Sequence, residues 1–327
     1  MDLTGRSGHE AVPAMREAIE SQMLVVTGEP VDVDQLVQRA GDAWALWHSS
    51  PSPRAAVGAV LPRIISDGRR STRLLEGDQR RRAHAALSSA YALSEQLLAW
   101  VADGQLLWLT ADRCMASAEQ ADDPLALALA AWVVGNVWRV TGREDDALRL
   151  ATDAADLLTP RLDSGQEARA LWGAVRLHAA ITSAKMGREG DALRYLDDAA
   201  EMAAAMPDYA HAATLFGIPN ATLTGVSVHV ELRKGSKAVD VADAVDPDSI
   251  PSQDRRARVW LEVARAYSQR KDNTVAVHVL QRAVNTSQEA MMCHPLARSL
   301  ASELVTSGGR IVERDARALA SAIGVSV

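Results

Sequence analysis

The sequence predicts an all-α protein in which antiparallel helix pairs stack into a right-handed solenoid. Of the 327 residues, 48% are hydrophobic but only 4% are aromatic, and alanine is very common. Runs of β-branched and aromatic residues bounded by turns, which are typical of strands, are almost absent. Hydrophobic residues instead recur with helical spacing along most of the chain. A helix-pair motif and its repetition are the other two observations behind this prediction.

The helix-pair motif begins with Gly135, a small residue where two helices can cross closely, and Trp138 fills the space one turn later. Gly142 is expected to end the first helix in the left-handed conformation, which glycine adopts without strain. Ala147 and Ala154 then give the second helix a small-residue seam. This order and spacing resembles a tetratricopeptide (TPR) repeat, so we expect a TPR-like helical-repeat solenoid.

The motif returns 45 residues further along the chain, at Ala180, Gly187, Ala192 and Ala199. Four matches at one offset indicate an internal repeat. A third unit is expected to end its first helix at Gly235. A fourth unit shows the same pattern of small and aromatic residues at Ala264, Tyr267, Ala276 and Ala283.

The chain is expected to have three parts. Residues 1–9 are polar and contain glycine, so we expect them to be disordered. Residues 10–77 form N-terminal helices, and a loop with a short helical piece is expected over 68–77. Residues 78–327 form the repeat domain, which is continuous with these helices.

Within the first 77 residues, helices are expected to begin near Ala11, after Asp32 or Asp34, and after Pro53. The expected helices of the repeat domain are 78–101, 105–121, 124–141 and 144–158, then pairs within 166–206 and 214–245, a helix over 257–271 with its partner, and closing helices at 295–306 and 313–323. The last of these would cap the stack, which a solenoid needs at its end.

Charge and cysteine content exclude several classes of protein. The net charge of −7 has the wrong sign for a chain that mainly binds nucleic acid. Cys114 and Cys293 lie far apart without metal-ligand spacing, so we expect reduced thiols in a cytoplasmic protein. No secretory signal is visible, and no hydrophobic run reaches the ~20 residues that a membrane helix needs.

Motifs for catalysis are absent from the sequence: it has no His-Glu-x-x-His, no Gly-x-Ser-x-Gly, no phosphate loop and no dinucleotide-binding glycine pattern. His178 has no partner set with the spacing of a mechanism, so it is expected to be a core histidine. We therefore expect no catalytic residue, no metal site and no cofactor.

A stack of helix pairs forms a concave groove that is lined by the first helix of each pair. Each unit places one cation near this groove, namely Arg139, Lys185, Arg233 and Arg265. Such a groove favours an acidic or carboxylate-bearing ligand, because Arg can pair bidentately with a carboxylate. Alternatively, these cations only complement the dipoles of helix C-termini and are solvated. The candidate groove residues are Trp132, Asn136, Arg139, Leu177, Lys185, Asn220, His229, Arg233, Arg258 and Arg265.

Four short sequence segments are typical of a narrower family: Leu106-Leu-Trp-Leu-Thr-Ala-Asp-Arg113, Phe216-Gly-Ile-Pro-Asn220, the segment from Arg255 to Tyr267, and His294-Pro-Leu-Ala-Arg298. From about Ala11 onward, the chain resembles the C-terminal TPR-like sensor region of actinobacterial transcriptional regulators that carry an N-terminal XRE-type helix-turn-helix. The resemblance implies a role connected with gene regulation. The family carries a histidine where this chain has Thr224, which implies a changed ligand contact at that position.

The residues before the helix led by Asp32 are too few for a helix-turn-helix module. Either the DNA-binding module was lost, or the sequence is part of a longer chain. We expect a non-enzymatic sensor or adaptor that binds a small molecule or short peptide in its groove. It would act through a protein partner or as a homodimer, without direct contact to nucleic acid or membrane.

Two other functions remain open. An enzyme or enzyme-accessory protein of specialised metabolism could use the groove as its site, which a buried polar cluster of His178, His229 and Asn220 would favour. An assembly scaffold would instead fill the groove with the protein's own N-terminal helix.

Overall fold

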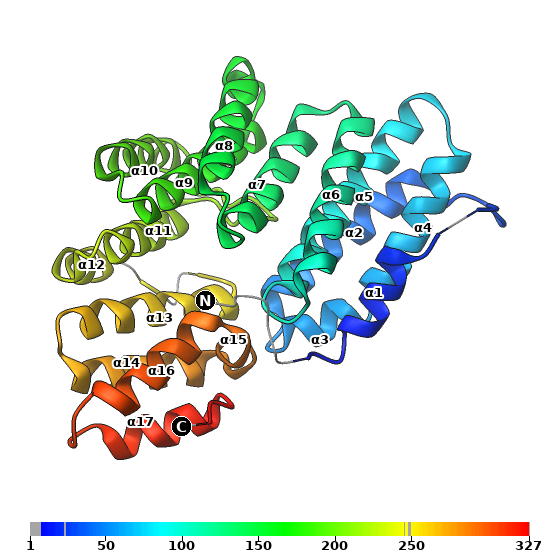
Figure 1. Cartoon of the computed structure of the whole chain (residues 1–327). Coiled ribbons are helices and arrows are strands. Elements are labelled where there is room, and N and C mark those ends of the chain that lie inside the picture. Colours follow the sequence, from blue (N-terminus) through cyan, green and yellow to red (C-terminus); the bar gives the residue numbers. More distant parts are fainter. Residues whose placement is uncertain (1–7, 23, 245, 248–249, 327) are drawn as a thin grey trace. The chain divides into compact units, whose positions relative to one another are not determined.

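The computed structural model describes residues 8–22, 24–244, 246–247 and 250–326 (Figure 1). The described part consists of helices joined by turns and loops and contains no strand. The predicted all-α, TPR-like helical-repeat class is confirmed. The expected disorder of the N-terminus falls largely on residues 1–7, which lie outside the described residues. No described helix is long and apolar enough to span a membrane.

The chain divides into two compact units. The first contains residues 1–47, 53–179 and 208–215, and the second contains 48–52, 180–207 and 216–327. These bounds differ from the expected parts 10–77 and 78–327, which stay a prediction. Positive and negative side chains balance in the second unit, so the net negative charge of the chain belongs to the first unit.

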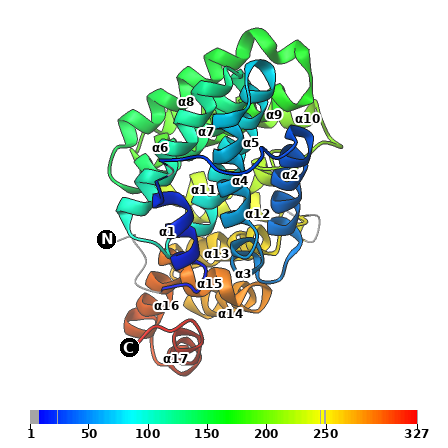
Figure 2. The same cartoon turned by 90° about the vertical axis from the view of Figure 1, so that its right-hand side faces the viewer.

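The first unit is a run of helices, and from α3 to α8 each packs on the next. In order they are α1 (Val12–Glu20), α2 (Val33–Ser49), α3 (Pro53–Gly58), α4 (Leu61–Leu74), α5 (Gly77–Leu98), α6 (Gly104–Ala121), α7 (Pro124–Val140), α8 (Glu144–Leu158), the 3-10 helix η1 (Thr159–Ser164) and most of α9 (Gln166–Lys185). The closest pair is α5 with α6. The N-terminal helix α1 packs against α3, α4 and α6 of the same unit (Figure 2).

Helix α4 corrects one prediction, because it continues through the segment from Gly68 onward that was expected to be a loop. Buried contacts hold it helical despite its weak helix formers. Asp67 accepts hydrogen bonds from Arg39 at 2.8 Å and from Arg70 at 2.6 Å. Gly68 lies so close to α5 that a β-carbon there would be 3.1 Å from Cδ1 of Leu87.

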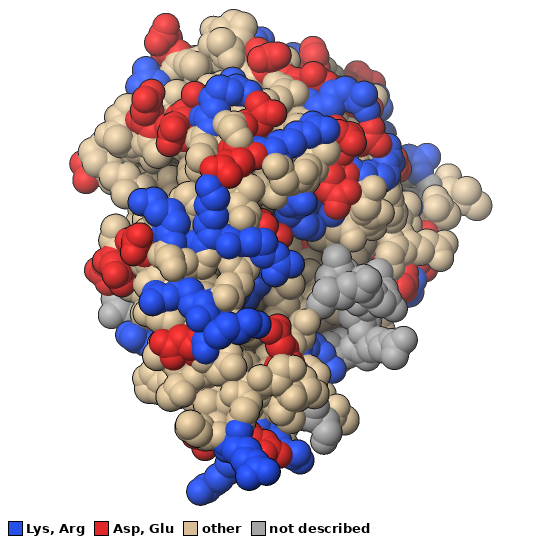
Figure 3. All heavy atoms as spheres, turned by 60° about the vertical axis from the view of Figure 1, so that its left-hand side comes forward, with Lys and Arg blue, Asp and Glu red and all other residues tan. Residues whose placement is uncertain are grey.

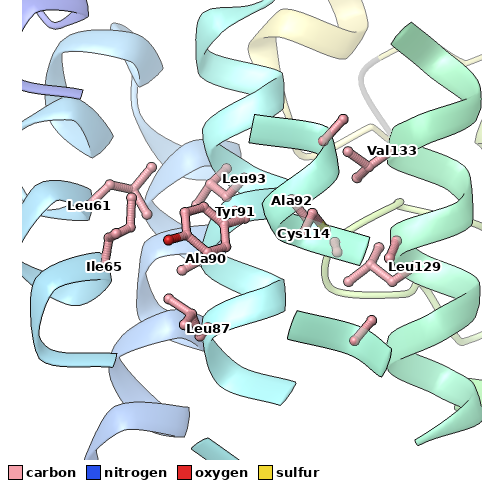
Figure 4. Packing of buried hydrophobic residues seen from close by; sticks show 14 of the residues in the cluster. Leu61, Ile65, Leu87, Ala90, Tyr91, Ala92, Leu93, Cys114, Leu129 and Val133 are labelled. Carbon is pink, nitrogen blue, oxygen red and sulfur yellow. The ribbon is translucent and has the colours of Figure 1, made fainter. Parts of the chain in front are cut away.

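The core of the first unit is centred on α5 (Figure 4). Tyr91 lies toward Leu61 and Ile65 of α4. Cys114 of α6 is fully buried, and its thiol lies within 3.3 Å of the Ser88 carbonyl oxygen. Burial raises the pKa of the Cys114 thiol to about 12, so it stays protonated near neutral pH and packs as a small hydrophobic residue.

The second unit continues the helix pairs. Its elements are the end of α9, then α10 (Glu189–Ala204), α11 (Ile218–Glu231), α12 (Gly235–Ala242), α13 (Gln253–Gln269), α14 (Asn273–Thr286), α15 (Gln288–Cys293), α16 (Pro295–Ser307) and α17 (Glu313–Ala322). Successive helices pack from α10 to α14, and α16 packs on α17. The short helix α15 was not predicted; Ser287 caps it by accepting from the Ala290 amide at 3.3 Å.

Four left-handed residues mark the ends of the first helices: Gly142 (φ 81°), Gly187 (φ 73°), Arg233 (φ 60°) and Lys271 (φ 63°). In each case the next amide donates to the carbonyl five residues earlier, at 2.8 to 3.0 Å. This is the Schellman arrangement that closes helix C-termini. The same turn therefore fixes the register of four consecutive repeats.

The third repeat departs from the expectation that Gly235 ends its first helix. Helix α11 ends at Glu231, Arg233 takes the left-handed position, and Gly235 begins α12. Gly235 is needed for another reason, because a β-carbon there would lie 2.7 Å from the carbonyl oxygen of Ala266 on α13. The predicted register of this repeat was thus wrong by two residues.

The left-handed turns allow a direct test. Gly142→Ala is expected to lower the free energy of unfolding by about 1 kcal/mol, and Lys271→Gly to raise it by up to about 1 kcal/mol, because a β-carbon disfavours this backbone region. Lys237→Gly, inside α12, is the matched control and is expected to lower stability by about 1 kcal/mol. Urea denaturation measures all three. Equal effects of the two Lys→Gly changes would refute the role of the turn.

Candidate functional site

The strongest candidate site is formed by α11 and α13, the first helices of consecutive repeats. Residues at helical spacing share one face of each helix. We call them together the α11–α13 face; they are Asn220, Thr224, Ser227 and Glu231 on α11, and Arg255, Arg258, Glu262, Arg265 and Gln269 on α13. The two helices meet there, since Glu231 pairs with Arg265 at 2.8 Å and Gln269 donates to the Val230 carbonyl at 2.8 Å.

At the C-terminal end of this face, Arg265 is held between two carboxylates. Its guanidinium lies 2.8 Å from Glu231 and 2.7 Å from Glu262. Burial alone would lower the pKa of Arg265, but the charges of Glu262 and Glu231 raise it above its usual value. The positive charge of Arg265 is therefore already balanced. A ligand contact by this residue stays a prediction.

The N-terminal end of the face is cationic. Arg255 and Arg258 lie one turn apart on α13, and the charge of Arg258 disfavours the charged form of Arg255. Arg258 was among the predicted site residues, whereas Arg255 was missed. Arg255 stands three residues before Arg258, which places both on the same face of a helix. This spacing can be read from the sequence.

His229 and Arg233, also predicted as groove residues, do not lie on the α11–α13 face. His229 stands four residues before the left-handed residue, as Trp138 and Tyr267 do in their repeats, and it is buried. Burial has the largest effect and lowers the pKa of His229, and the positive charges of Lys237 and Lys234 lower it further. Arg233 is exposed in the turn itself. The two-residue shift of register explains both placements, because it brings Glu231 onto the face instead.

Four other predicted residues belong to the first unit. On α7, Arg139 donates to the side-chain oxygen of Asn136 at 2.9 Å, and Trp132 is half-buried against a small hydrophobic cluster. Leu177 on α9 is buried. Lys185, at the end of α9, is exposed and belongs to the second unit.

His178 packs against α7 at Gly135. A β-carbon at position 135 would lie 2.7 Å from Cε1 and 3.0 Å from Nε2 of the His178 ring. Burial and then the charge of Arg139 hold the pKa of His178 well below its usual range. The ring is therefore neutral near pH 7 and fills the helix crossing that Gly135 opens.

Exposed cations of the second unit include Arg233, Lys234, Arg270 and Lys271 in the turns that follow α11 and α13, and Lys237 in the first turn of α12. Figure 3 shows a face of the molecule on which Lys and Arg side chains gather. Within the described ranges, no group of three His, Cys, Asp or Glu side chains is arranged to hold a metal ion.

Comparison with known proteins shows the fold. No model of a protein family matches the chain. No curated protein sequence matches it. Among solved structures, the chain is similar to the crystal structure of a Rap protein complexed with competence and sporulation factor, with a TM-score of 0.50 and 13% sequence identity. The similarity covers 89% of this chain and 87% of the Rap protein, so the likeness of fold extends over almost the whole of both chains.

Proposed function

We propose that this chain is a non-enzymatic regulatory protein that binds a short peptide or a carboxylate-bearing small molecule at the α11–α13 face. The observation that carries the proposal is the unequal charge of this face. At one end two carboxylates balance Arg265, whereas at the other end no described residue pairs with the guanidinium of Arg255. The half-buried polar side chains of this face offer hydrogen bonds to a ligand.

The similarity of fold supports the proposal in one respect. The Rap protein of that structure is complexed with competence and sporulation factor, so a protein of this architecture accommodates another molecule. We further propose kinship with the TPR-like sensor regions of actinobacterial XRE-type regulators, and thus a cytoplasmic role in gene regulation through a protein partner or a homodimer.

Two observations bear on the other functions. His178 packs against Gly135 within the first unit, which gives it a structural role, and His229 and Asn220 belong to the second unit. The N-terminal helix α1 packs against α3, α4 and α6 of the first unit. This contact gives no support to a scaffold whose groove is filled by that helix.

The proposal is tested by blocking the face with a bulky side chain. The full chain is incubated with an equimolar library of random pentapeptides, and native mass spectrometry identifies what it retains. Ser227→Trp, on the α11–α13 face, is expected to reduce retention at least about tenfold, because the indole would cover neighbouring side chains of this face. Ser236→Trp, on the exposed first turn of α12, is the control and should retain the same peptides as the wild type.

The same spectra of the freshly purified protein report its stoichiometry and any small molecule that it carries. If Ser227→Trp and Ser236→Trp retain the same ligands equally, the α11–α13 face is not the binding site.

A further inference from the structure

We infer that Arg255, beside Arg258, is an anchor for a carboxylate at the N-terminal end of the α11–α13 face. The inference rests on the proposed function and specifies the chemistry of its ligand. It begins with an unusual feature of Arg255. This side chain is half-buried, yet its guanidinium makes no hydrogen bond or ion pair to any described residue; only its backbone amide is engaged, with Ser252 Oγ at 3.4 Å.

The surroundings of Arg255 disfavour its charge. Burial lowers the pKa of Arg255 to about 10, the positive charge of Arg258 acts in the same direction, and Asp254 acts against them. The N-terminal end of α13 adds the positive end of a helix dipole. Arg265, three turns further along the same face, shows the opposite arrangement, because two carboxylates neutralise it. Among the described residues, Arg255 thus lacks the carboxylate partners that Arg265 has.

The register of the two helices places α11 groups opposite this cation. Helix α11 packs on α12, and α12 packs on α13. In a stack of antiparallel pairs α11 and α13 therefore run in the same direction, so Asn220, near the start of α11, lies at the same end of the face as Arg255 and Arg258, near the start of α13. A ligand could therefore place a carboxylate on Arg255 while its amide groups lie within reach of the Asn220 side chain.

A carboxylate is the ligand chemistry that fits best. The planar guanidinium forms two parallel hydrogen bonds with a carboxylate, and such bonds strengthen when water is excluded. In a peptide, the carboxylate can be the C-terminus or an acidic side chain. Both sources share this chemistry, and a C-terminally amidated library distinguishes them.

The test uses Arg255→Met in the full chain, with Arg256→Met as the matched control on a different side of α13. Each variant is offered the random pentapeptide library with free C-termini, and separately the same library with amidated C-termini. We expect Arg255→Met to retain at least about tenfold less peptide, because a charge-assisted bond is lost, and Arg256→Met to match the wild type. Loss of retention on amidation assigns the C-terminal carboxylate; retention of only Asp- or Glu-containing amidated peptides assigns a side chain.

Thermal unfolding separates a binding role from a structural one. Removing a half-buried cation that pairs with no described residue should leave the Tm of Arg255→Met equal to or above that of the wild type. A clearly lowered Tm would make Arg255 a structural residue and overturn the inference, as would unchanged peptide retention. If Ser227→Trp abolishes peptide retention while Arg255→Met does not, the α11–α13 face is the binding site, as proposed, but Arg255 is not an anchor for a carboxylate.

Discussion

Replacing Arg265 by Met is expected to lower the free energy of unfolding by about 3 kcal/mol. The change leaves Glu231 and Glu262 facing each other without their shared cation, and their side chains are only 21% and 9% exposed. Two desolvated like charges destabilise a fold more than the loss of one exposed ion pair would. Urea denaturation followed by circular dichroism at 222 nm measures the change.

The double variant Glu262→Gln, Arg265→Met separates charge from packing. It removes one carboxylate together with the cation, so we expect it to be more stable than Arg265→Met alone. Equal stability of the two variants would show that the ion pairs with Arg265 do not offset the cost of burying these carboxylates. This expectation also makes Arg265→Ala a poor probe of ligand binding, since a loss of affinity could follow from a loss of structure.

Gly135→Ala is expected to destabilise the protein by about 2 kcal/mol, although alanine is the better helix former. The added β-carbon would lie 2.7 Å from the buried His178 ring, so the ring or a helix must move. Overpacking of this kind costs about 1–3 kcal/mol and outweighs the helix-propensity gain of about 1 kcal/mol in an otherwise rigid core. Thermal and urea unfolding of the single variant give the value.

A double-mutant cycle with His178→Ala tests the cause. We expect Gly135→Ala to cost much less when the ring is absent, which appears as a coupling energy of at least about 1 kcal/mol. Gly190→Ala on α10 is the control, because no atom lies within 4 Å of its added β-carbon; it should be neutral or stabilising by up to about 1 kcal/mol. A cycle without coupling would mean that His178 is not what excludes a side chain at Gly135.

Local chemistry made most of the fold predictable. Gly142 and Gly187 have the positive φ that their positions after hydrophobic helical runs indicated. Ala147, Ala192 and Ala276 are all fully buried at the seams of second helices. These features depend on a few neighbouring residues, so a sequence pattern can identify them.

Residues whose role depends on distant neighbours were misplaced. Gly235 was expected to end a helix, but the backbone of α13 approaches it, and no local pattern reports that contact. Gly68 continues a helix because Leu87 packs on it. The site shows the same limit, since the ion pair of Arg265 with Glu231 forms between two helices and no pattern along one helix reports it.

The left-handed turns that end the first helices differ in their residues. This difference makes the stability of some repeats more sensitive to salt concentration than that of others. Gly142 and Gly187 hold their φ values without strain, whereas Arg233 and Lys271 do so against the preference of a β-carbon. Both cations lie within two residues of the C-terminal ends of α11 and α13, where the helix dipole favours a positive charge. High ionic strength screens that attraction but leaves the backbone strain unchanged. The third and fourth repeats should therefore lose stability as salt rises, while the glycine-closed repeats before them are less affected.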